Sequence, residues 1–521
     1  MRRASSPARS SDARAPSIVP GCAPLVLAVA PGTLDRLADA VLAPGTPAER
    51  IRAVYWDSAR CALGRRGYAL CVEDSGGGRL QRLEGIAARA DGAGQTVQPP
   101  APISGCEPEP ARIAPAAVRR LAVRSALRPV FTLEFERRTG RIVPAADSAI
   151  ELRFDRGAIR ADGRRERLCE IELEARHGPF WRLYEAALAL EARAPLQVEA
   201  RSRAARGYAL ARRLQPLPVK AGVAVVRDAM SVLEAFRAIG FVCLAHLNAN
   251  RQGMLAAADP EFLHQMRVAL RRLRSAFTVF ARALPEAATA PALAEVRWLL
   301  GALGPARDWD VLSEGLLASL RAREPAHPGW VAIGRAVEAR RAAAQRAARR
   351  AVGSRRYTRF VLGLGAWLSG EPWLALLPLE QARRLRRPVR EYARETLARR
   401  YRQVRKRGRG LTGLDAEALH RLRIAVKKLR YTAQFFAPLY SARRAAAMRR
   451  ALEALQDALG AINDCATAAR LVAEACAGVR AARLREAQAL FERANERALA
   501  AHRRGLKAAW RAFRAADRYW E

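Results

Sequence analysis

Two runs of basic residues, each with a histidine at its start, recur in this chain at one spacing. The run at 264–274 (HQMRVALRRLR) matches the run at 420–430 (HRLRIAVKKLR) at an offset of 156 residues. On a helix, positions i, i+3, i+7 and i+10 fall within an arc of roughly 80°, so each run would place a row of cations on one face. Such a row is unfavourable for the helix by itself, whereas a linear polyanion laid across both rows would neutralise the charges and release counterions. The candidate anion-binding residues are His264, Arg267, Arg271, Arg272 and Arg274 in the first run and His420, Arg423, Lys427, Lys428 and Arg430 in the second.

A second pair of motifs keeps the same offset. The stretch at 303–308 (LGPARD) matches 459–464 (LGAIND), again 156 residues apart. Two separate motifs at one spacing predict the duplication of a whole helical unit. Arg307 adds a cation to the candidate residues, and Asn463 stands at the equivalent position of the second copy, which predicts a weaker second site. The alternative for both rows is a solvated basic face, paired in part by Asp308 and Asp464.

The net charge agrees with an anionic ligand but does not require one. Lys and Arg total 91 against 50 Asp and Glu, a formal charge of +41. Of the basic residues 86 are arginine, whose guanidinium group binds phosphate oxygens in bidentate pairs and stays charged. Residues 1–220 carry a net +12 and residues 221–521 a net +29, so most of the excess lies in the second part. Arginine-rich chains also arise from genomic base composition, so composition alone leaves both interpretations open.

Several classes of protein are disfavoured. No apolar run approaches the ~18 residues that a membrane span needs, and the basic start of the chain does not resemble a secretory signal. The eight cysteines are scattered without a Cys-x-x-Cys pair, which is typical of reduced core residues and not of a disulfide framework or zinc site. We therefore expect a cytoplasmic protein without a membrane span.

The first part of the chain shows a mixed α and β pattern. Residues 1–20 are rich in Arg, Ser and Pro and are expected to form a disordered tail, followed by one domain at 21–215. In that domain we expect a hairpin around the glycines at 76–78, a long loop at 85–118, a helix at 178–192, and strands at 129–137, 149–154 and 168–175.

The second part, 216–521, is expected to be a separate helical domain. It opens on a Pro-containing linker at 215–218 and continues as long Ala/Leu/Arg segments with helical spacing. The repeat divides it into halves at about 222–370 and 371–521. We expect its helices to be interrupted at the prolines, which are Pro260, Pro285, Pro305, Pro325, Pro328, Pro372 and Pro388.

The helical part resembles the CHAD family, the conserved histidine α-helical domain. The resemblance runs from about residue 221 to the end and rests on both histidine-headed runs, on their order, and on the stretch at 303–310 (LGPARDWD). It implies an all-α domain of two pseudo-symmetric helical bundles whose basic surface binds inorganic polyphosphate. The binding positions that it implies are the residues of the two runs, to which we add Arg307.

Residues 21–213 resemble a CYTH, or triphosphate tunnel, domain. The likeness lies in the stretches 55–57 (YWD), 63–70 (LGRRGYAL), 150–157 (IELRFDRG), 169–174 (CEIELE) and 206–208 (RGY). That family folds as an antiparallel barrel, so the resemblance implies an α+β tunnel barrel ahead of the helical domain. In the family's tunnel, carboxylates hold Mg²⁺ or Mn²⁺ and basic residues hold a triphosphate.

The acidic residues of one expected strand could form such a metal site. Glu170, Glu172 and Glu174 alternate along the strand and so share one face. Glu151 and Asp155 could join them, because hard divalent ions prefer clustered oxygen ligands; the alternative is a solvent-facing acidic strand. We expect Mg²⁺ or Mn²⁺ at Glu151, Glu170, Glu172 and Glu174 only if the tunnel is active, and no cofactor for binding by the helical domain.

The resemblance breaks down at several charged positions of the tunnel. The family opens with a Glu-x-Glu-x-Lys strand, and the matching stretch at 22–26 (CAPLV) has lost both carboxylates and the lysine. Basic positions of the family are occupied by Cys71, Glu73 and Glu84, and Arg203 and Arg206 alone do not restore them. Acids in place of cations would repel a triphosphate. We therefore predict a degenerate tunnel that performs no chemistry.

Three functions follow, in order of preference. The first is binding of inorganic polyphosphate by the helical domain, with the tunnel domain as a scaffold and an association with cytoplasmic polyphosphate granules. The second is metal-dependent hydrolysis of inorganic triphosphate in the tunnel. The third is nucleic-acid binding, which the charge permits, although the basic rows lack aromatic platforms for stacking bases and no helix-turn-helix or zinc pattern is present.

Overall fold

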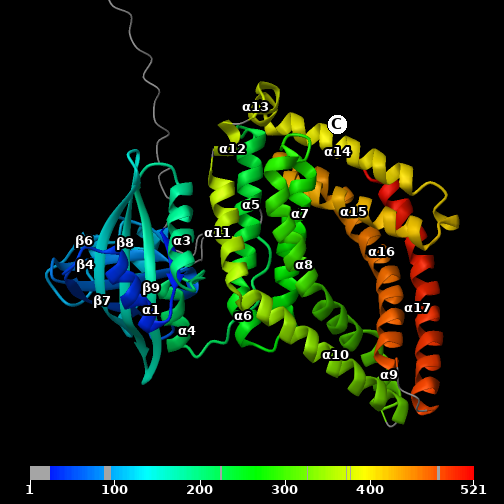
Figure 1. Ribbon diagram of the computed structural model, residues 1–521, viewed down its shortest axis with the longest axis horizontal. Coiled ribbons are helices and arrows are strands. Elements are labelled where there is room, and N and C mark those ends of the chain that lie inside the picture. The colour runs from blue at the N-terminus through cyan, green and yellow to red at the C-terminus, as the bar shows by residue number, and fades with distance from the viewer. Residues whose placement is uncertain are drawn as a thin grey trace, which may run out of the picture. The chain divides into compact units, whose positions relative to one another are not determined.

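The computed structural model describes residues 24–86, 95–222, 226–325, 327–370, 372–375, 377–477 and 482–521. The expected tail at 1–20 lies outside these residues, as does part of the expected loop at 85–118. The chain divides into an N-terminal unit, Met1–Leu214 with Gly365–Gly370, and a helical unit, Gln215–Leu364 with Glu371–Glu521. Figure 1 colours both units along the chain.

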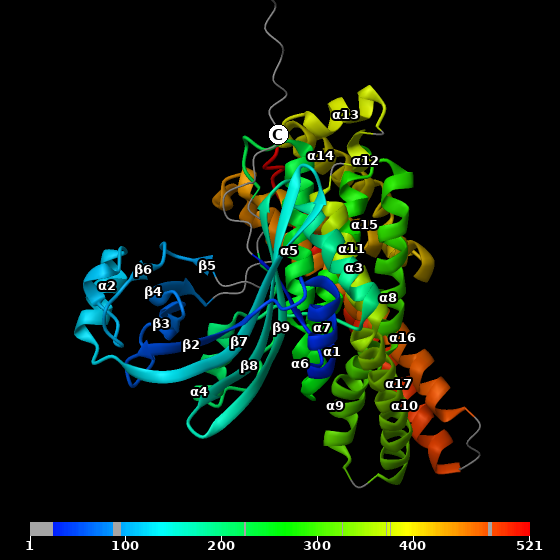
Figure 2. The ribbon, with the colours of Figure 1, turned by 60° about the vertical axis from the view of Figure 1, so that its left-hand side comes forward.

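A ten-stranded antiparallel sheet forms the framework of the N-terminal unit. The strand order is β10-β1-β9-β8-β7-β2-β3-β4-β5, and β6 pairs with β4. The long neighbouring strands β7, β8 and β9 curve together through the middle of the sheet (Figure 2). The strands are β1 (Leu25–Ala28), β2 (Ala48–Asp57), β3 (Tyr68–Ser75), β4 (Gly78–Gly85), β5 (Gln95–Thr96), β6 (Ala101–Pro102), β7 (Arg128–Ala145), β8 (Ser148–Ala161), β9 (Arg164–His177) and β10 (Gln197–Val198).

The antiparallel α+β fold expected for this part is confirmed. The hairpin around 76–78 is β3–β4, and Gly78 adopts φ +106° at its turn, a conformation that glycine tolerates best. The three other expected strands lie within β7, β8 and β9, each of which is longer than expected. They extend past their apolar stretches because charged residues on facing strands pair, as Arg137 does with Asp155.

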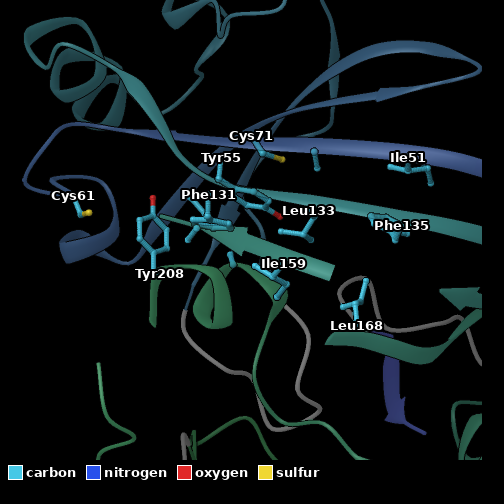
Figure 3. Packing of buried hydrophobic residues seen from close by; sticks show 14 residues of the cluster. Ile51, Tyr55, Cys61, Cys71, Phe131, Leu133, Phe135, Ile159, Leu168 and Tyr208 are labelled. Carbon is cyan, nitrogen blue, oxygen red and sulfur yellow. The ribbon is translucent and has the colours of Figure 1, made fainter. Parts of the chain in front are cut away.

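Helices and an aromatic core accompany the sheet. The helices are α1 (Pro31–Val41), α2 (Ala116–Arg124), α3 (Trp181–Arg193) and α4 (Arg203–Ala211), with short 3-10 turns η1 (Gly64–Arg66) and η2 (Pro110–Arg112). Figure 3 shows the buried cluster in which Tyr55 stacks on Phe131 at 4.3 Å between ring centroids. Tyr208 of α4 meets Phe131 edge-on at 5.1 Å. A Cβ at Gly207 would lie 2.0 Å from the Phe131 ring, so this glycine lets α4 pack directly on the sheet.

The helical unit contains α-helices throughout, as expected. They are α5 (Val232–Ala249), α6 (Arg251–Ala256), α7 (Pro260–Phe280), α8 (Glu286–Glu314), α9 (Leu316–Arg323), α10 (Pro328–Gly353), α11 (Arg355–Ser369, whose end belongs to the N-terminal unit), α12 (Pro372–Ala375), α13 (Leu379–Arg386), α14 (Val389–Arg407), α15 (Ala416–Phe436), α16 (Ala442–Cys476) and α17 (Ala482–Ala515). The 3-10 turns η3 (Leu411–Gly413) and η4 (Ala437–Leu439) flank α15.

The duplication is visible element by element. Helices α7 and α15 each have 21 residues and begin 156 residues apart, as do the starts of α8 and α16. Equivalent helices also pack on each other, α7 on α15, α8 on α16 and α10 on α17. Phe280 and Phe436, which occupy equivalent positions, meet with ring centroids 5.8 Å apart. The two copies of the unit therefore share one core.

One of the expected proline breaks is wrong. Pro305 lies inside α8, which also contains Pro291. A proline inside a helix removes a backbone hydrogen bond and strains the preceding turn. The helix continues through Pro305 because apolar residues on both sides of it are buried, namely Val296, Leu299, Leu303 and Ala306. Tertiary packing of an apolar face stabilises a helix more than local propensity does.

One helical stretch has the length and composition of a membrane span. It runs from Val232 to Ala256 with a mean hydropathy of 1.4, and 56% of its most apolar window is buried inside the structure. Phe236, Ile239 and Leu244 of this stretch belong to the core of the helical unit. Burial on this scale is typical of a core helix.

The cysteines of the described residues are all unpaired, as expected. Six of these seven thiols are buried and Cys106 is exposed.

Candidate anion-binding site

The two basic runs lie on α7 and α15, and the same local signals begin both helices. Asp259 caps α7 by accepting a hydrogen bond from the backbone N–H of Glu261, and Asp415, its equivalent, caps α15 by accepting one from Ala418. Capping aspartates are among the strongest helix starts. The apolar positions between the cations are buried, and this burial fixes which way the basic face turns. The buried residues include Met266, Leu270 and Leu273 on α7 and Leu422, Val426 and Leu429 on α15.

The basic faces of both helices line one cavity of about 680 Å³. Helices α8, α9, α16 and α17 supply the rest of its wall, with Gly315 between α8 and α9. We call it the central cavity. The expected site residues that line it are His264, Arg267, Arg271, Arg307, Arg423, Lys427 and Arg430. Both copies of the repeat therefore contribute to a single site. The sequence predicted two sites, of which the one with Asn463 would be weaker, but Arg307 and Asn463 line the same cavity.

Four expected site residues do not line this cavity. Arg274 and His420 are exposed outside it, and Arg272 is buried elsewhere, with 7% of its surface exposed. Lys428 faces another group of cations: burial lowers its pKa, and so do the charges of Arg400, Arg407 and Arg274. The predicted rows are therefore divided, because only part of each row faces the central cavity.

The cations of the central cavity are not paired by its acids. Among the described residues, no ion pair joins Asp308 or Asp464 to Arg267, Arg271 or Arg423. The Nε atoms of these three arginines are buried without a hydrogen-bond partner. Arg267 Nη1 donates only a long bond of 3.4 Å to the Leu300 carbonyl. A buried donor without an acceptor is costly, so the arginines that line this cavity are not fully satisfied by the protein itself.

The pKa values in the cavity shift as expected for crowded, poorly compensated cations. Burial, then the charges of Arg423 and Arg271, lowers the pKa of Lys427 to about 7. Burial lowers the pKa of Arg267 to about 10, because the carboxylate of Asp308 does not outweigh burial together with the neighbouring arginines. Burial and the charge of Arg307 also lower the pKa of His264, so this histidine is neutral at pH 7. A bound polyanion would reverse each of these shifts.

The second acid of the LGPARDWD stretch has a structural role. Asp310 is fully buried, and Arg341 Nε donates to its Oδ1 at 2.7 Å. Gln345 Nε2 donates to both of its oxygens, at 3.0 and 2.9 Å. Asp310 therefore joins α8 to α10 and is not available to the cavity.

The N-terminal unit places its acidic residues on one face of the sheet, as expected. Glu174 lies opposite Glu151, Glu172 opposite Arg153, and Glu170 opposite Asp155. On the other side of β9, Val26 lies beside Glu172, at a position where the resembled family would place a lysine. We call this surface, with its arginines, the ionic face.

Every carboxylate of the ionic face is bound by arginine. Arg153 donates to Glu151, Glu172 and Glu174 at 2.8, 2.6 and 2.5 Å. Arg137 binds Asp155 in a bidentate pair at 2.8 and 2.7 Å. From α4, Arg203 reaches Asp155 at 2.5 Å and Glu170 at 3.0 Å, and Arg206 pairs with Glu170 and with Glu166. The face is therefore a closed network of opposite charges.

The pKa values of this network shift in the opposite sense from those of the central cavity. Burial raises the pKa of Asp155, but Arg203 and Arg137 outweigh burial and hold it below its usual value. Arg176 and Arg153 likewise lower the pKa of Glu151 against the effect of burial. The pKa of Arg203 is raised well above its usual value because Asp155, Glu170 and Glu172 outweigh its burial. Charge and counter-charge stabilise each other here.

The residues of this face do not fit a divalent cation. Within the part of the chain that the structure describes, no group of three or more His, Cys, Asp or Glu side chains could hold a metal ion. The oxygens of Glu151, Glu170, Glu172 and Glu174 are directed at guanidinium groups, and Val26 supplies no ligand beside them. A metal would have to displace several arginines at once.

Several residues of the two sites were missed by the sequence analysis. Arg137 and Arg153 lie within the expected strands at 129–137 and 149–154 but were not among the candidate residues, although their alternation with the acids could have placed them on the ionic face. Asn495 and His502 of α17 line the central cavity, and neither belongs to a motif that repeats. Asn495 Nδ2 donates to the Cys465 carbonyl at 3.0 Å while its Oδ1 is buried without a partner.

Comparisons with known proteins agree with the resemblance of the helical unit. The family model for the CHAD domain matches residues 238–473. The crystal structure of the CHAD domain from the plant Ricinus communis is 32% identical, with a TM-score of 0.50, over 58% of this chain and 98% of that one. The chain therefore belongs to the CHAD family. A search of curated proteins finds no match.

Two further solved structures overlap with lower scores. PptA from Streptomyces chartreusis is 17% identical with a TM-score of 0.41, covering 54% of this chain and 100% of that one. The PH1819 protein from Pyrococcus horikoshii is 14% identical with a TM-score of 0.21, covering 33% and 86%. Neither contributes to the assignment, because both scores lie below 0.5. The likeness of the N-terminal unit to CYTH domains rests on its sequence motifs and its antiparallel sheet.

Proposed function

We propose that the helical unit binds inorganic polyphosphate in the central cavity. The observation that carries this proposal is the set of poorly compensated cations from both copies of the repeat that line one cavity. A chain of phosphates supplies closely spaced oxygens, each able to accept from the guanidinium groups that lack partners. Binding would come mainly from these contacts and would weaken steeply as salt is added.

The lining of the cavity favours a phosphate chain over a nucleic acid. Among the residues that line it, Tyr431 is the single aromatic side chain, and the guanidinium of Arg430 lies 5.0 Å from the centroid of its ring. Proteins that bind single strands stack successive bases on several aromatic platforms. A polyanion without bases makes better use of this wall. The same ligand would concentrate the protein at polyphosphate granules in the cytoplasm.

The test is equilibrium binding of polyphosphate to the full chain at fixed salt. The cavity variant replaces Arg267, Arg271, Arg423 and Lys427 with glutamine. The control variant makes the same change at Arg335, Arg443, Arg444 and Arg450, which are exposed and do not line the central cavity. We expect the cavity variant to lose affinity by at least about 100-fold, since each phosphate contact contributes through counterion release, and the control to lose far less. Equal losses of affinity in the two variants would show that the two basic rows act only as general surface charge.

Competition separates the ligand classes. Single-stranded RNA, added at equal phosphate concentration, is expected to leave most of the polyphosphate bound. Displacement of polyphosphate by the RNA would favour nucleic-acid binding over polyphosphate binding as the function of this cavity.

We also propose that the N-terminal unit performs no phosphate chemistry and serves as a scaffold. The support is the ionic face, in which every carboxylate expected to hold a metal is bound by arginine. The test is release of phosphate from tripolyphosphate with Mg²⁺ or Mn²⁺. We expect no turnover above background. Turnover that disappears in Glu172→Ala would establish the triphosphatase alternative.

A further inference from the structure

A second cavity of the helical unit lies between the end of α14 and the end of α17. Its volume is about 670 Å³, and the residues that line it include six cations and two aromatic rings but no carboxylate. We call it the α14–α17 cavity. Its cations are Arg402, Arg405, Arg409, Lys507, Arg511 and Arg514, and its aromatic residues are Tyr401 and Trp510.

Two glycines shape the loop that closes this cavity. Gly410 adopts φ +65°, the left-handed region that favours glycine. A Cβ at Gly408 would lie 2.1 Å from Cη2 of Trp510, so the indole ring packs directly on the backbone. Arg409 lies between these glycines and lines the cavity. The loop therefore places Arg409 beside the ends of α14 and α17, which form the wall of this cavity.

The two segments that form this cavity contain no acidic residue. Between Glu395 and Asp415 the chain carries seven Lys or Arg, and between Glu496 and Asp517 it carries six. Elsewhere in the helical unit some exposed arginines pair with an acid one turn away, as Arg470 does with Glu474 at 3.1 Å. A concave surface with charge of one sign concentrates anionic ligands.

Helix α17 connects the central cavity with the α14–α17 cavity. His502 lines the first and Lys507 lines the second, and Arg503 and Arg504 are exposed between them. At 1.5 Å per residue, the helix advances roughly 14 Å from His502 to Arg511. A chain that leaves the central cavity beside His502 would meet positive charge without interruption as it passes around α17.

We propose that the α14–α17 cavity is a second binding site for phosphate chains, and that a long polyphosphate occupies both cavities at once. This inference rests on the proposed function. Contact with the second cavity becomes intramolecular once the first is filled, so affinity rises with chain length without any change in the contacts at the first. A chain too short to span α17 gains nothing. The helical unit therefore selects long chains.

The test compares tripolyphosphate with long-chain polyphosphate. The variant replaces Arg409, Arg511 and Arg514 with glutamine; within the described residues these three form no side-chain hydrogen bond or ion pair, so the fold should tolerate the change. The matched control replaces Arg443, Arg444 and Arg450 with glutamine. We expect the variant to lose at least about tenfold in long-chain affinity, with tripolyphosphate affinity unchanged and the control close to wild type.

Three outcomes would overturn the proposal. A variant that matches the control with long chains shows that the second cavity is not occupied. Equal losses for both ligands show an effect of general charge. A variant that loses single-stranded RNA binding while it retains polyphosphate assigns the cavity to another polymer. Failure of the proposed function is distinct, because wild type itself would then bind neither phosphate ligand.

Discussion

The ionic face of the N-terminal unit and the central cavity of the helical unit both gather arginines, with opposite consequences. On the ionic face, Arg137, Arg153, Arg203 and Arg206 are each bound to carboxylates. In the central cavity the arginines keep buried Nε atoms without partners, and the two nearby aspartates do not pair with them. The comparison shows that the number of arginines does not distinguish a structural network from a ligand-binding site. What distinguishes them is whether carboxylates of the protein already pair with those arginines.

The largest effect is expected from breaking the closed network. Glu170→Gln leaves Arg206, of which 4% is exposed, without its buried partner, and loss of one member of a buried pair costs about 3–5 kcal/mol. Hydrogen exchange measured by mass spectrometry on β8 and β9 peptides would report the loss in this unit alone. Glu185→Gln, which removes an exposed pair with Arg182, is the control and should change stability by less than about 1 kcal/mol. Similar small effects of both variants would break the comparison.

The corresponding change in the central cavity should have the opposite sign. Arg267→Met removes a buried, poorly compensated charge and keeps an unbranched side chain in place of the aliphatic part of the arginine. We expect the free energy of unfolding of the ligand-free helical unit to rise by about 0.5–2 kcal/mol, because residues kept for binding are often unfavourable for stability. Thermal unfolding without ligand would show the gain, and polyphosphate binding would show the accompanying loss. Arg443→Met, at an exposed position, is the control. Destabilisation by Arg267→Met would mean that the arginine is compensated after all.

A third effect concerns pH. The pKa of Lys427 is about 7 in the folded chain and about 10.4 in an unfolded one. Between these values the unfolded state binds more protons, so the stability of the ligand-free unit rises with pH through this range. Lys427→Met should therefore be more stable than wild type at pH 6, and its advantage should shrink by pH 9. Thermal unfolding at both pH values measures the difference, and an advantage that does not change with pH would show that Lys427 titrates normally.

The smallest effect distinguishes two equivalent glycines. A Cβ at Gly304 would lie 3.2 Å from Arg267 Nη1, whereas one at Gly460 meets nothing within 4 Å. Alanine at either position should favour the helix by up to about 1 kcal/mol, but Gly304→Ala crowds Arg267 and should weaken polyphosphate binding a few-fold. Gly460→Ala should bind as wild type does. Equal affinity of both variants would show that the position of Arg267 is not critical.

Much of this architecture could be predicted from the sequence, because it depends on local signals that repeat. The offset of 156 residues between the histidine-headed runs predicted equivalent helices, and α7 and α15 begin at that offset. Alternation of Glu170, Glu172 and Glu174 predicted their common face, which the β8–β9 register confirms. Both inferences needed only the period of a helix or strand.

The remainder depends on tertiary structure. Helical periodicity placed His264, Arg267, Arg271 and Arg274 on one arc, but it could not show which of them face a cavity. Arg274 and His420 were therefore expected at the binding site, although they lie outside the central cavity. The contribution of α17 came from packing and carried no repeated motif. Pro305 was expected to end a helix, yet burial on both sides of it keeps α8 continuous. Likewise, only the register across strands could pair Arg153 with three glutamates.

The central claim is that polyphosphate fills the cavity lined by the repeat, and the rarity of lysine allows a direct test. The chain has five lysines, at 220, 406, 427, 428 and 507, each of which can be followed by acetylation and mass spectrometry. At pH 8 the lowered pKa of Lys427 leaves it neutral and reactive, so in the free protein it should be acetylated readily. We expect tripolyphosphate to protect Lys427 strongly while Lys220 and Lys406, which are exposed outside the cavity, react as before. Equal protection of all the lysines, or continued modification of Lys427 under saturating ligand, would contradict the account.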